Sequence, residues 1–145
     1  MKALIQRVKE ASVTIDGKLY SKIGKGILVF VGVEKEDQNI NAEKLAEKIV
    51  NLRIFEDENE KMNYSVIDVG GEILVVSQFT LCGDCKKGTR PSFDKSAPLD
   101  KAIELYDYFV DRVRLSGLKT ATGKFRSMMD VALINDGPVT FWIEK

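Results

Sequence analysis

Two short polar segments, each at the end of an apolar run, carry the groups in this sequence that could do chemistry. The first is 77–81 (SQFTL), which follows the apolar run 73–76, and the second is 135–140 (NDGPVT), which follows 131–134. A strand that ends in polar residues brings hydroxyls and unpaired backbone groups to the rim of a sheet, where a ligand can reach them. The step Gly137-Pro138 is a turn that a cis peptide could occupy.

The sequence contains no histidine, so the usual general base at neutral pH is missing. Ser77 and Thr80 carry hydroxyls, but a hydroxyl nucleophile needs a neighbouring base to take its proton. No lysine or carboxylate is tied to either residue by the sequence pattern, and a Ser-His-Asp triad is excluded. Any catalysis must therefore come from backbone dipoles, hydroxyls or the substrate itself. The alternative is that both hydroxyls simply bond to backbone or solvent.

Cys82 and Cys85 form a C-x-x-C pair, which is typical of redox centres or of half a zinc site. A redox pair usually begins a helix in a βαβ unit, and this pair falls in an expected loop. A structural zinc site needs four ligands, and the sequence offers no other cysteine and no histidine. We expect two free thiols and no bound metal.

Composition favours one globular domain over residues 1–145, with 44% hydrophobic and 30% charged residues. No apolar run reaches membrane-spanning length, and the first residues lack the pattern of a signal peptide. We therefore expect a cytoplasmic protein with no membrane contact. The net charge is zero, so any contact with RNA should be local. The segment 86–90 is the strongest basic cluster, and its alternative interpretation is an ordinary solvated loop.

The pattern of elements predicts an α+β fold. Strands are expected at 2–15, 18–23, 27–33, 72–81, 118–122, 128–135 and 139–144. The first helix is expected from a cap at Asn41 through 44–54, and the second from Pro98 to a stop at Gly117. Residues 56–63 and 82–97 are expected to be loops. The order β-β-β-α-β-α-β-β-β predicts an antiparallel, barrel-like β-sheet with two packed helices.

The two polar segments, in this order, resemble the paired motifs of the D-aminoacyl-tRNA deacylase family. Further similar stretches lie at 1–8, 11–13, 24–26, 31–34, 48–55, 68–71 and 87–93. The resemblance runs from end to end of the chain. It implies an enzyme without a cofactor that hydrolyses the ester of D-aminoacyl-tRNA, and of glycyl-tRNA mischarged on tRNA-Ala, in chirality proofreading. It also implies a homodimer.

By this resemblance the backbone of Ser77, Gln78, Phe79 and Thr80 lies against the aminoacyl ester. The amides of Phe79 and Thr80 are then the candidates for an oxyanion hole, which can contribute ~3–4 kcal/mol per donor. A side-chain nucleophile is unnecessary in that case. Water would attack the ester carbonyl, and the 2′-hydroxyl of the substrate ribose would position or activate it.

The resemblance also makes Gly137 and Pro138 a Gly-cisPro element that enters the partner subunit's site across a dimer interface. Their carbonyls would accept hydrogen bonds from the substrate α-ammonium, which reads chirality without reading the side chain. The alternative is a simple turn between two strands. Arg7 would support this turn through its fork of donors, although an isolated arginine is most often a surface residue.

Phe125 and Met129 match the family's segment for the terminal adenosine, and the alternative for both is core packing. Arg126 and Ser127 replace two small residues of that segment, so adenosine binding is expected to differ in detail, and Arg126 is a candidate phosphate contact. Two other functions compete with the deacylase. One is a non-catalytic module that binds the end of an RNA, and the other is a thiol redox or metal protein.

Overall fold

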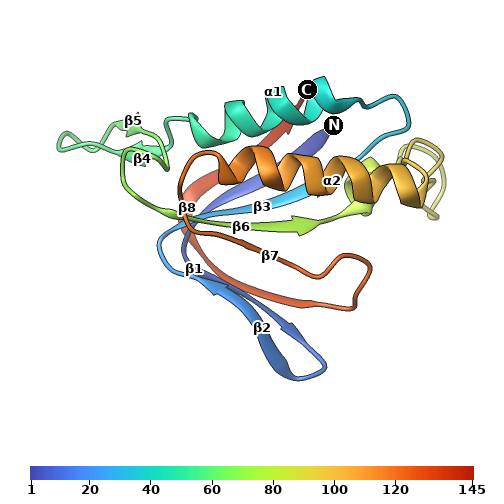
Figure 1. Cartoon of the computed structure of the whole chain (residues 1–145), viewed down its shortest axis with the longest axis horizontal. Helices are drawn as coiled ribbons and strands as arrows, with labels where there is room; N and C mark the ends of the chain where they lie inside the picture. The colour runs from blue at the N-terminus through green and yellow to red at the C-terminus, as the bar shows by residue number, and fades with distance from the viewer.

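The computed structural model describes residues 1–145 as a curled sheet with two helices lying side by side on one face (Figure 1). The elements in chain order are β1 (Lys2–Ile15), β2 (Lys18–Ile23), β3 (Gly26–Gly32), α1 (Asn39–Val50), β4 (Phe55–Glu56), β5 (Met62–Tyr64), β6 (Glu72–Ser77), the 3₁₀ helix η1 (Phe79–Cys82), α2 (Leu99–Arg114), β7 (Thr120–Thr122) and β8 (Asp130–Glu144). The expected α+β class with two packed helices is confirmed. Neither α1 nor α2 has the length and apolar surface that a bilayer-spanning helix needs.

The main sheet is mixed, and the expectation of a purely antiparallel sheet was wrong in this detail. Its order is β2-β1-β3-β6-β7, and β8 pairs with β1. β1 is antiparallel to β2, β3 and β8, whereas β3–β6 and β6–β7 are parallel pairs. Parallel neighbours need a long crossover connection, and α1 and α2 supply these connections.

The sheet curls until its two ends meet, which gives the expected barrel-like shape. β2 and β7 lie at opposite ends of the strand order. The Ser21 hydroxyl on β2 nevertheless donates to the Thr122 carbonyl on β7 at 2.9 Å. Figure 1 shows the β1–β2 hairpin extending away from the two helices.

Both faces of the central strands are buried, in two separate apolar clusters. On the helix side, Ile27 and Val29 of β3 pack with residues of α1 and α2 such as Leu45 and Phe109. On the opposite side, Leu28 packs inside the curl of the sheet with residues of β1 and β6. Successive side chains of a strand point to opposite faces. This explains why β3 is an almost continuous apolar run in the sequence.

The helix boundaries differ from the expected ones at α1 and agree at α2. α1 begins at Asn39 because the Gln38 amide donates to the Asn41 side chain at 2.9 Å, so Asn41 lies inside the first turn. It ends at Val50, not at Ile54, because the chain turns there and Ile54 enters the core with 3% exposure. α2 starts directly after Pro98, and Gly117 stops the following turn with a φ of 77°.

Three other boundaries correct the sequence interpretation. The segments 128–135 and 139–144 form one strand, β8, whose pairing with β1 shifts register on both sides of Val8. These irregularities let the strand carry the NDGPVT turn without ending. β6 stops at Ser77, and the rest of SQFTL enters η1. Within the expected loop 56–63, a short hairpin of β4 and β5 forms.

Candidate active site

A cavity of about 620 Å³ opens where β6 ends, and SQFTL forms part of its wall. Ser77, Gln78 and Phe79 contribute from the end of β6, and Phe125 and Met129 contribute from the segment before β8. Most of the lining residues are hydrophobic, and Arg126 is the one ionisable side chain among them. The cavity can therefore hold an apolar or aromatic group, but its wall supplies no carboxylate or lysine as a base.

The SQFTL segment changes from strand to 3₁₀ helix within one residue. The Gln78 amide still pairs with the Val31 carbonyl on β3, at 2.7 Å. The next two amides, of Phe79 and Thr80, open η1, and the first amides of a helix have no partner within it. Neither amide donates to a loop or a turn. Two consecutive N–H groups are thus left free beside the cavity.

The two hydroxyls in SQFTL occupy different environments. Ser77 lines the cavity, whereas Thr80 is exposed and is not part of the wall. The Thr80 hydroxyl accepts a hydrogen bond from the Gln78 side-chain amide. No basic side chain contacts it, so the geometry gives Thr80 no means to lose a proton to the protein.

Phe125 and Met129 line the cavity and also pack against the two apolar clusters, so the expected core packing is present for both. The Phe125 ring lies 5.6 Å from the ring of Tyr106, measured between centroids. The Tyr106 hydroxyl donates to the Val75 carbonyl at 3.0 Å, and burial raises its pKa well above the ordinary value, so it stays a neutral donor. Met129 packs against the cluster inside the sheet. Both side chains are therefore held by the fold.

Gly137 and Pro138 are exposed on β8, and the peptide bond between them is cis, as expected. Arg7 is 3% exposed and holds this turn from beneath. Its guanidinium contacts the Asp136 carboxylate at 3.0 Å and donates to the Gly137 carbonyl at 3.5 Å. It also donates to the Ile54 carbonyl at 2.6 Å. Arg7 is thus a buried clamp on the turn and not a surface residue.

The structure brings the predicted site residues together in two groups. Ser77, Gln78 and Phe79 share the cavity with Phe125 and Met129, as their assignment to one site requires. Arg7, Gly137 and Pro138 form the second group, and none of them lines the cavity. Within one chain, the SQFTL segment and the Gly-Pro turn do not line a common cavity.

Sequence reasoning missed several residues that support these groups. Phe93 packs on Phe79, with ring centroids 5.1 Å apart. Asn135 donates to the carbonyls of Arg7 and Val139, at 3.0 and 3.1 Å, and so braces the turn from inside β8. Asn135 and Asp136 belong to the NDGPVT motif, and the presence of two polar side chains next to a Gly-Pro step was the signal that could have identified them.

The cysteine pair does not have the geometry of a redox centre. Cys82 is buried, and its thiol donates to the Val33 carbonyl at 3.4 Å. Burial raises the pKa of this thiol, which disfavours the reactive thiolate. Cys85 is exposed, both thiols are free, and no three His, Cys, Asp or Glu side chains are grouped to hold a metal ion.

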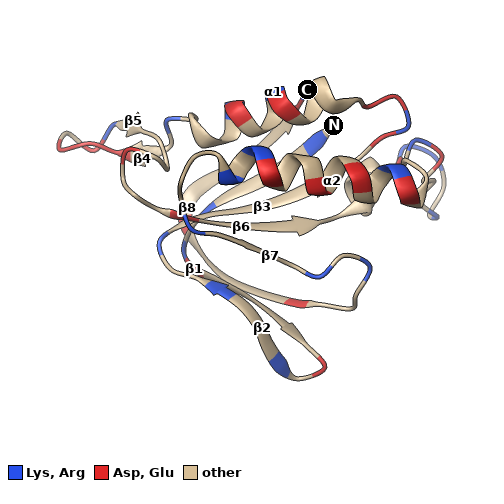
Figure 2. Cartoon of the chain, in the orientation of Figure 1, with Lys and Arg blue, Asp and Glu red and all other residues tan.

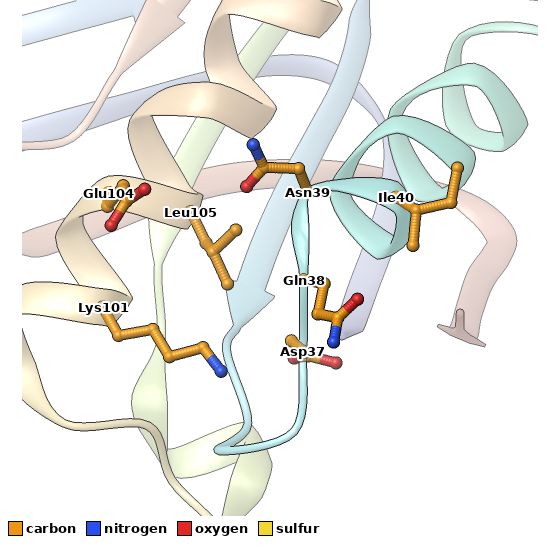
Figure 3. Close-up of a pocket in the computed structure, with 7 residues that line it drawn as sticks. All are labelled: Asp37, Gln38, Asn39, Ile40, Lys101, Glu104 and Leu105. Atoms are coloured by element: carbon orange, nitrogen blue, oxygen red, sulfur yellow. The ribbon is translucent and has the colours of Figure 1, made fainter.

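A second hollow, of about 390 Å³, lies on the helix layer between the start of α1 and the first turns of α2 (Figure 3). Lys101 and Glu104 of α2 face the segment from Asp37 to Ile40 there. It contains none of the predicted site residues. Its Asp37 carboxylate is already occupied by the α-ammonium group of Met1 and by the Glu34 amide. This hollow is therefore a feature of the packing between the helices.

The fold is a curled, mixed sheet with two helices on one face, and its mainly apolar cavity lies where β6 ends. The chain matches the family model described as D-Tyr-tRNA(Tyr) deacylase over residues 4–144, and it belongs to that family. The resemblance seen in the sequence is thereby confirmed.

Individual relatives agree with this membership. The chain is 60% identical to a D-aminoacyl-tRNA deacylase of Thermodesulfovibrio yellowstonii over 141 residues, 97% of each chain. It is 57% identical to a D-aminoacyl-tRNA deacylase of Pelobacter propionicus over 145 residues, 100% of both chains.

Two solved structures share the fold. One is described as a c-Myc DNA unwinding element binding protein, with a TM-score of 0.94 and 44% identity over 100% of this chain and 99% of that one. The other is described as a probable eukaryotic D-amino acid tRNA deacylase, with a TM-score of 0.86 over 99% and 98% of the two chains. At 17% identity, the second supports the fold alone.

Proposed function

We propose that this protein hydrolyses the ester bond between a D-amino acid and the 3′ end of tRNA, releasing the free amino acid and the tRNA. Its family relatives carry the name D-aminoacyl-tRNA deacylase, and the protein is accordingly a hydrolase of aminoacyl-tRNA. The observation that carries the proposal is that SQFTL walls a mainly apolar cavity beside two free backbone amides. A tRNA substrate implies a cytoplasmic enzyme.

The free amides of Phe79 and Thr80 are the proposed oxyanion hole. Water attacks the ester carbonyl, and the oxygen that becomes negative is stabilised by N–H groups that are already fixed at the start of η1. Each such donor contributes ~3–4 kcal/mol of transition-state stabilisation. Ser77 and Gln78 complete the wall on which the ester lies.

The substrate itself supplies the remaining catalytic group. The cavity wall holds no carboxylate, lysine or histidine that could take a proton from water. We therefore assign the positioning or activation of water to the 2′-hydroxyl of the terminal ribose. Phe125 and Met129 hold the adenosine that carries this ribose.

A second copy of the chain completes the site. Gly137 and Pro138 are exposed and outside the cavity wall, so they can serve a cavity only on another subunit. The adjacent part of β8 exposes Phe141 and Trp142, by 41% and 49%, as an apolar surface suited to an interface.

The Gly-Pro turn of the partner is proposed to set the stereochemistry. Its carbonyls bind the substrate α-ammonium group, and the side chain of an L-amino acid would then point at them. The side chain of a D-amino acid points into open space, and glycine has no side chain. The enzyme should therefore spare L-aminoacyl-tRNA and accept D-aminoacyl-tRNA and glycyl-tRNA, including glycine mischarged on tRNA-Ala.

The direct test is deacylation of matched D- and L-aminoacyl-tRNA by the purified protein. We expect rapid release of the D-amino acid and protection of the L-ester. Equal cleavage of both esters would contradict the assignment. Binding without release of amino acid would support a non-catalytic RNA-end module instead. The double variant Cys82→Ser/Cys85→Ser should retain activity, and its inactivation would favour the thiol protein.

A tRNA that ends in 2′-deoxyadenosine, charged on its 3′-hydroxyl with a D-amino acid, tests the role of RNA. It should bind nearly as well as the ribose form and be cleaved far more slowly. Each tenfold loss corresponds to ~1.4 kcal/mol of transition-state stabilisation. Cleavage of the deoxy substrate at the normal rate would require a base within the protein.

A further inference from the structure

A third hollow, of about 310 Å³, lies in the loop between η1 and α2 and has no hydrophobic residue in its wall. We call residues 84–95 the basic loop. Its wall includes Lys86, Lys87, Arg90 and Lys95, with Asp84 and Asp94 between them. The base of the loop is fixed by reciprocal backbone hydrogen bonds between Asp84 and Ser92, at 2.8 and 3.0 Å. The four cations are thus gathered by a folded loop.

The four cations outnumber the two carboxylates that share the hollow with them, those of Asp84 and Asp94, so the hollow keeps a net positive charge. None of them belongs to any of the ion pairs in the structure. The Asp84 carboxylate within the loop accepts the Lys86 backbone amide at 2.9 Å. The chain as a whole has zero net charge, so this concentration does not follow from a general excess of lysine and arginine. Figure 2 shows it as blue segments beside the beginning of α2.

The basic loop adjoins the proposed active site. Lys95 lines the basic hollow, and the next residue, Ser96, lines the cavity at the end of β6. Phe93 of the loop packs on Phe79 of SQFTL at 5.1 Å between ring centroids. Arg126 lines the same cavity from the segment before β8. Positive charge therefore stands at the mouth of a cavity whose own wall is mainly apolar.

We propose that the basic loop binds phosphodiester groups of the RNA strand whose aminoacylated 3′ end occupies the cavity, with Lys86, Lys87 and Arg90 as the positioning residues. This inference rests on the proposed function. Arginine matches a phosphate with two parallel donors, and lysine acts as a point charge. Such contacts fix the position of a strand without reading its sequence. A local cluster also explains how a neutral protein can hold a polyanion.

The test compares two triple variants that remove the same charge. K86A/K87A/R90A empties the basic loop, and K44A/K48A/R112A removes three exposed cations from α1 and α2. The probe is an uncharged RNA hairpin of acceptor-stem sequence ending in CCA, and its binding is measured by fluorescence anisotropy at several salt concentrations. The loop variant should bind roughly 10- to 100-fold more weakly at low salt. Its slope of log K against log salt should fall by about 2, at ~0.7–0.9 per lost phosphate contact.

Kinetics supply the second readout. On D-aminoacyl-tRNA, the loop variant should lose kcat/KM mainly through KM. On a D-aminoacyl-adenosine, which has no phosphate, it should match the wild type. If the alanine variant is less stable than the wild type, K86Q/K87Q/R90Q repeats the test, because glutamine keeps more of the side-chain length. Circular dichroism checks that both variants are folded.

Failure of this inference is distinct from failure of the proposed function. Unchanged hairpin binding and salt slope in the loop variant would overturn the inference, even if the D-ester is hydrolysed. Equal weakening by both triple variants would also overturn it, because only overall charge would then matter. If the wild type cleaves no D-ester, the proposed function fails, and hairpin binding by the variants still decides the role of the loop.

Discussion

A single buried guanidinium connects the Gly137-Pro138 turn to the rest of the molecule. Arg7 reaches the Asp136 carboxylate, the Ile54 carbonyl and the Gly137 carbonyl at once. A fork of fixed donors suits several acceptors in different directions, and a lysine ammonium cannot replace it. At the residue scale, Asn135 braces the turn from within β8, and Arg7 holds it from a position 130 residues away in sequence from Gly137.

Arg7→Lys should destabilise the protein because it leaves buried acceptors without donors. We expect a loss of roughly 2–4 kcal/mol in the free energy of unfolding, measured by urea denaturation. Deacylation should fall as well, since the turn loses its support. Arg114→Lys is the matched control, because Arg114 makes an exposed ion pair with Asp111 whose loss costs about 1 kcal/mol or less. Equal stability of the two variants would contradict the role of Arg7.

Thr80→Ala should keep substantial activity, since we assign Thr80 its backbone amide and not its hydroxyl. The hydroxyl's hydrogen bond comes from Gln78, and it has no basic neighbour. We expect less than a tenfold decrease in kcat, or less than ~1.4 kcal/mol. Complete loss of activity in a folded variant that still binds tRNA would restore Thr80 as a nucleophile, as would a trapped acyl-enzyme at this residue.

At the scale of elements, the parallel pairing of β3 with β6 holds the SQFTL segment in place. Gly26 stands opposite Glu72 at the start of this pair, and Gln78 closes it at the other end by its bond to Val31. The two strands approach so closely at Gly26 that a side chain does not fit. The position of SQFTL is therefore set by pairing that begins at Glu72, five residues before Ser77.

Gly26→Ala should disrupt this pair. A Cβ at Gly26 would lie 1.8 Å from the Glu72 carbonyl oxygen, which is backbone and cannot rotate away. We expect a destabilisation of more than about 3 kcal/mol, measured by thermal or urea unfolding. Gly24→Ala is the control two residues away, where a Cβ meets nothing within 4 Å and the change should be within about 0.5 kcal/mol. Similar stability of both variants would mean that the strands can separate freely.

Glu72 should make part of the stability depend on acid pH. Its hydrogen bond from Lys119, and then that from the Gly24 amide, hold the pKa of this carboxyl below its ordinary value of 4.5. The unfolded chain then takes up the proton first. The stabilisation of about 1 kcal/mol is present above pH 4.5 and is lost as the pH falls through the lower, folded pKa.

Glu72→Gln should remove this contribution and flatten the decline of stability between pH 5 and pH 3, measured by urea denaturation at each pH. The exposed Glu36→Gln is the control and should follow the wild-type curve. If the stability of the Glu72→Gln variant declines with falling pH as steeply as that of the wild type, other carboxylates account for the acid response.

At the scale of the whole molecule, the proposed site needs two copies of the chain. The cavity beside SQFTL lies apart from Gly137 and Pro138, which face outward on β8. In a dimer with a twofold axis, each copy would place its Gly137-Pro138 turn at the cavity of the other copy. Symmetric pairs are the commonest protein assemblies, and they make two such exchanges at once.

The protein should therefore be a homodimer at micromolar concentration, as measured by sedimentation. Two inactive variants, one altered in the Gly137-Pro138 turn and one altered in η1, should regain deacylation activity when they are mixed. The mixed dimer keeps one site that is built from an unaltered η1 and an unaltered turn. Sedimentation of a monomer alone, with full activity, would contradict the cross-subunit site.

The sequence alone determined the class of the fold, most of the strands and the family, because these depend on local signals. The apolar run of β3 identified a strand buried on both faces, and Pro98 and Gly117 marked the limits of the second helical segment. Asp16 and Gly17 lie between β1 and β2, and both have the positive φ that a two-residue hairpin turn of this sequence type requires. SQFTL and NDGPVT pointed to the family without any knowledge of contacts.

Only the tertiary structure decided how these pieces meet. Strand direction was missed because the parallel pairing of β3 with β6 is a contact across more than forty residues of sequence that leaves no local pattern. The same is true of Arg7, whose burial depends on acceptors from the β4 region and from β8. The separation of the cavity from the outward turn arises from the curl of the sheet, which places the end of β6 and the middle of β8 on different parts of the surface. Local chemistry follows from residue types, whereas the distance between two groups follows from how the whole chain packs.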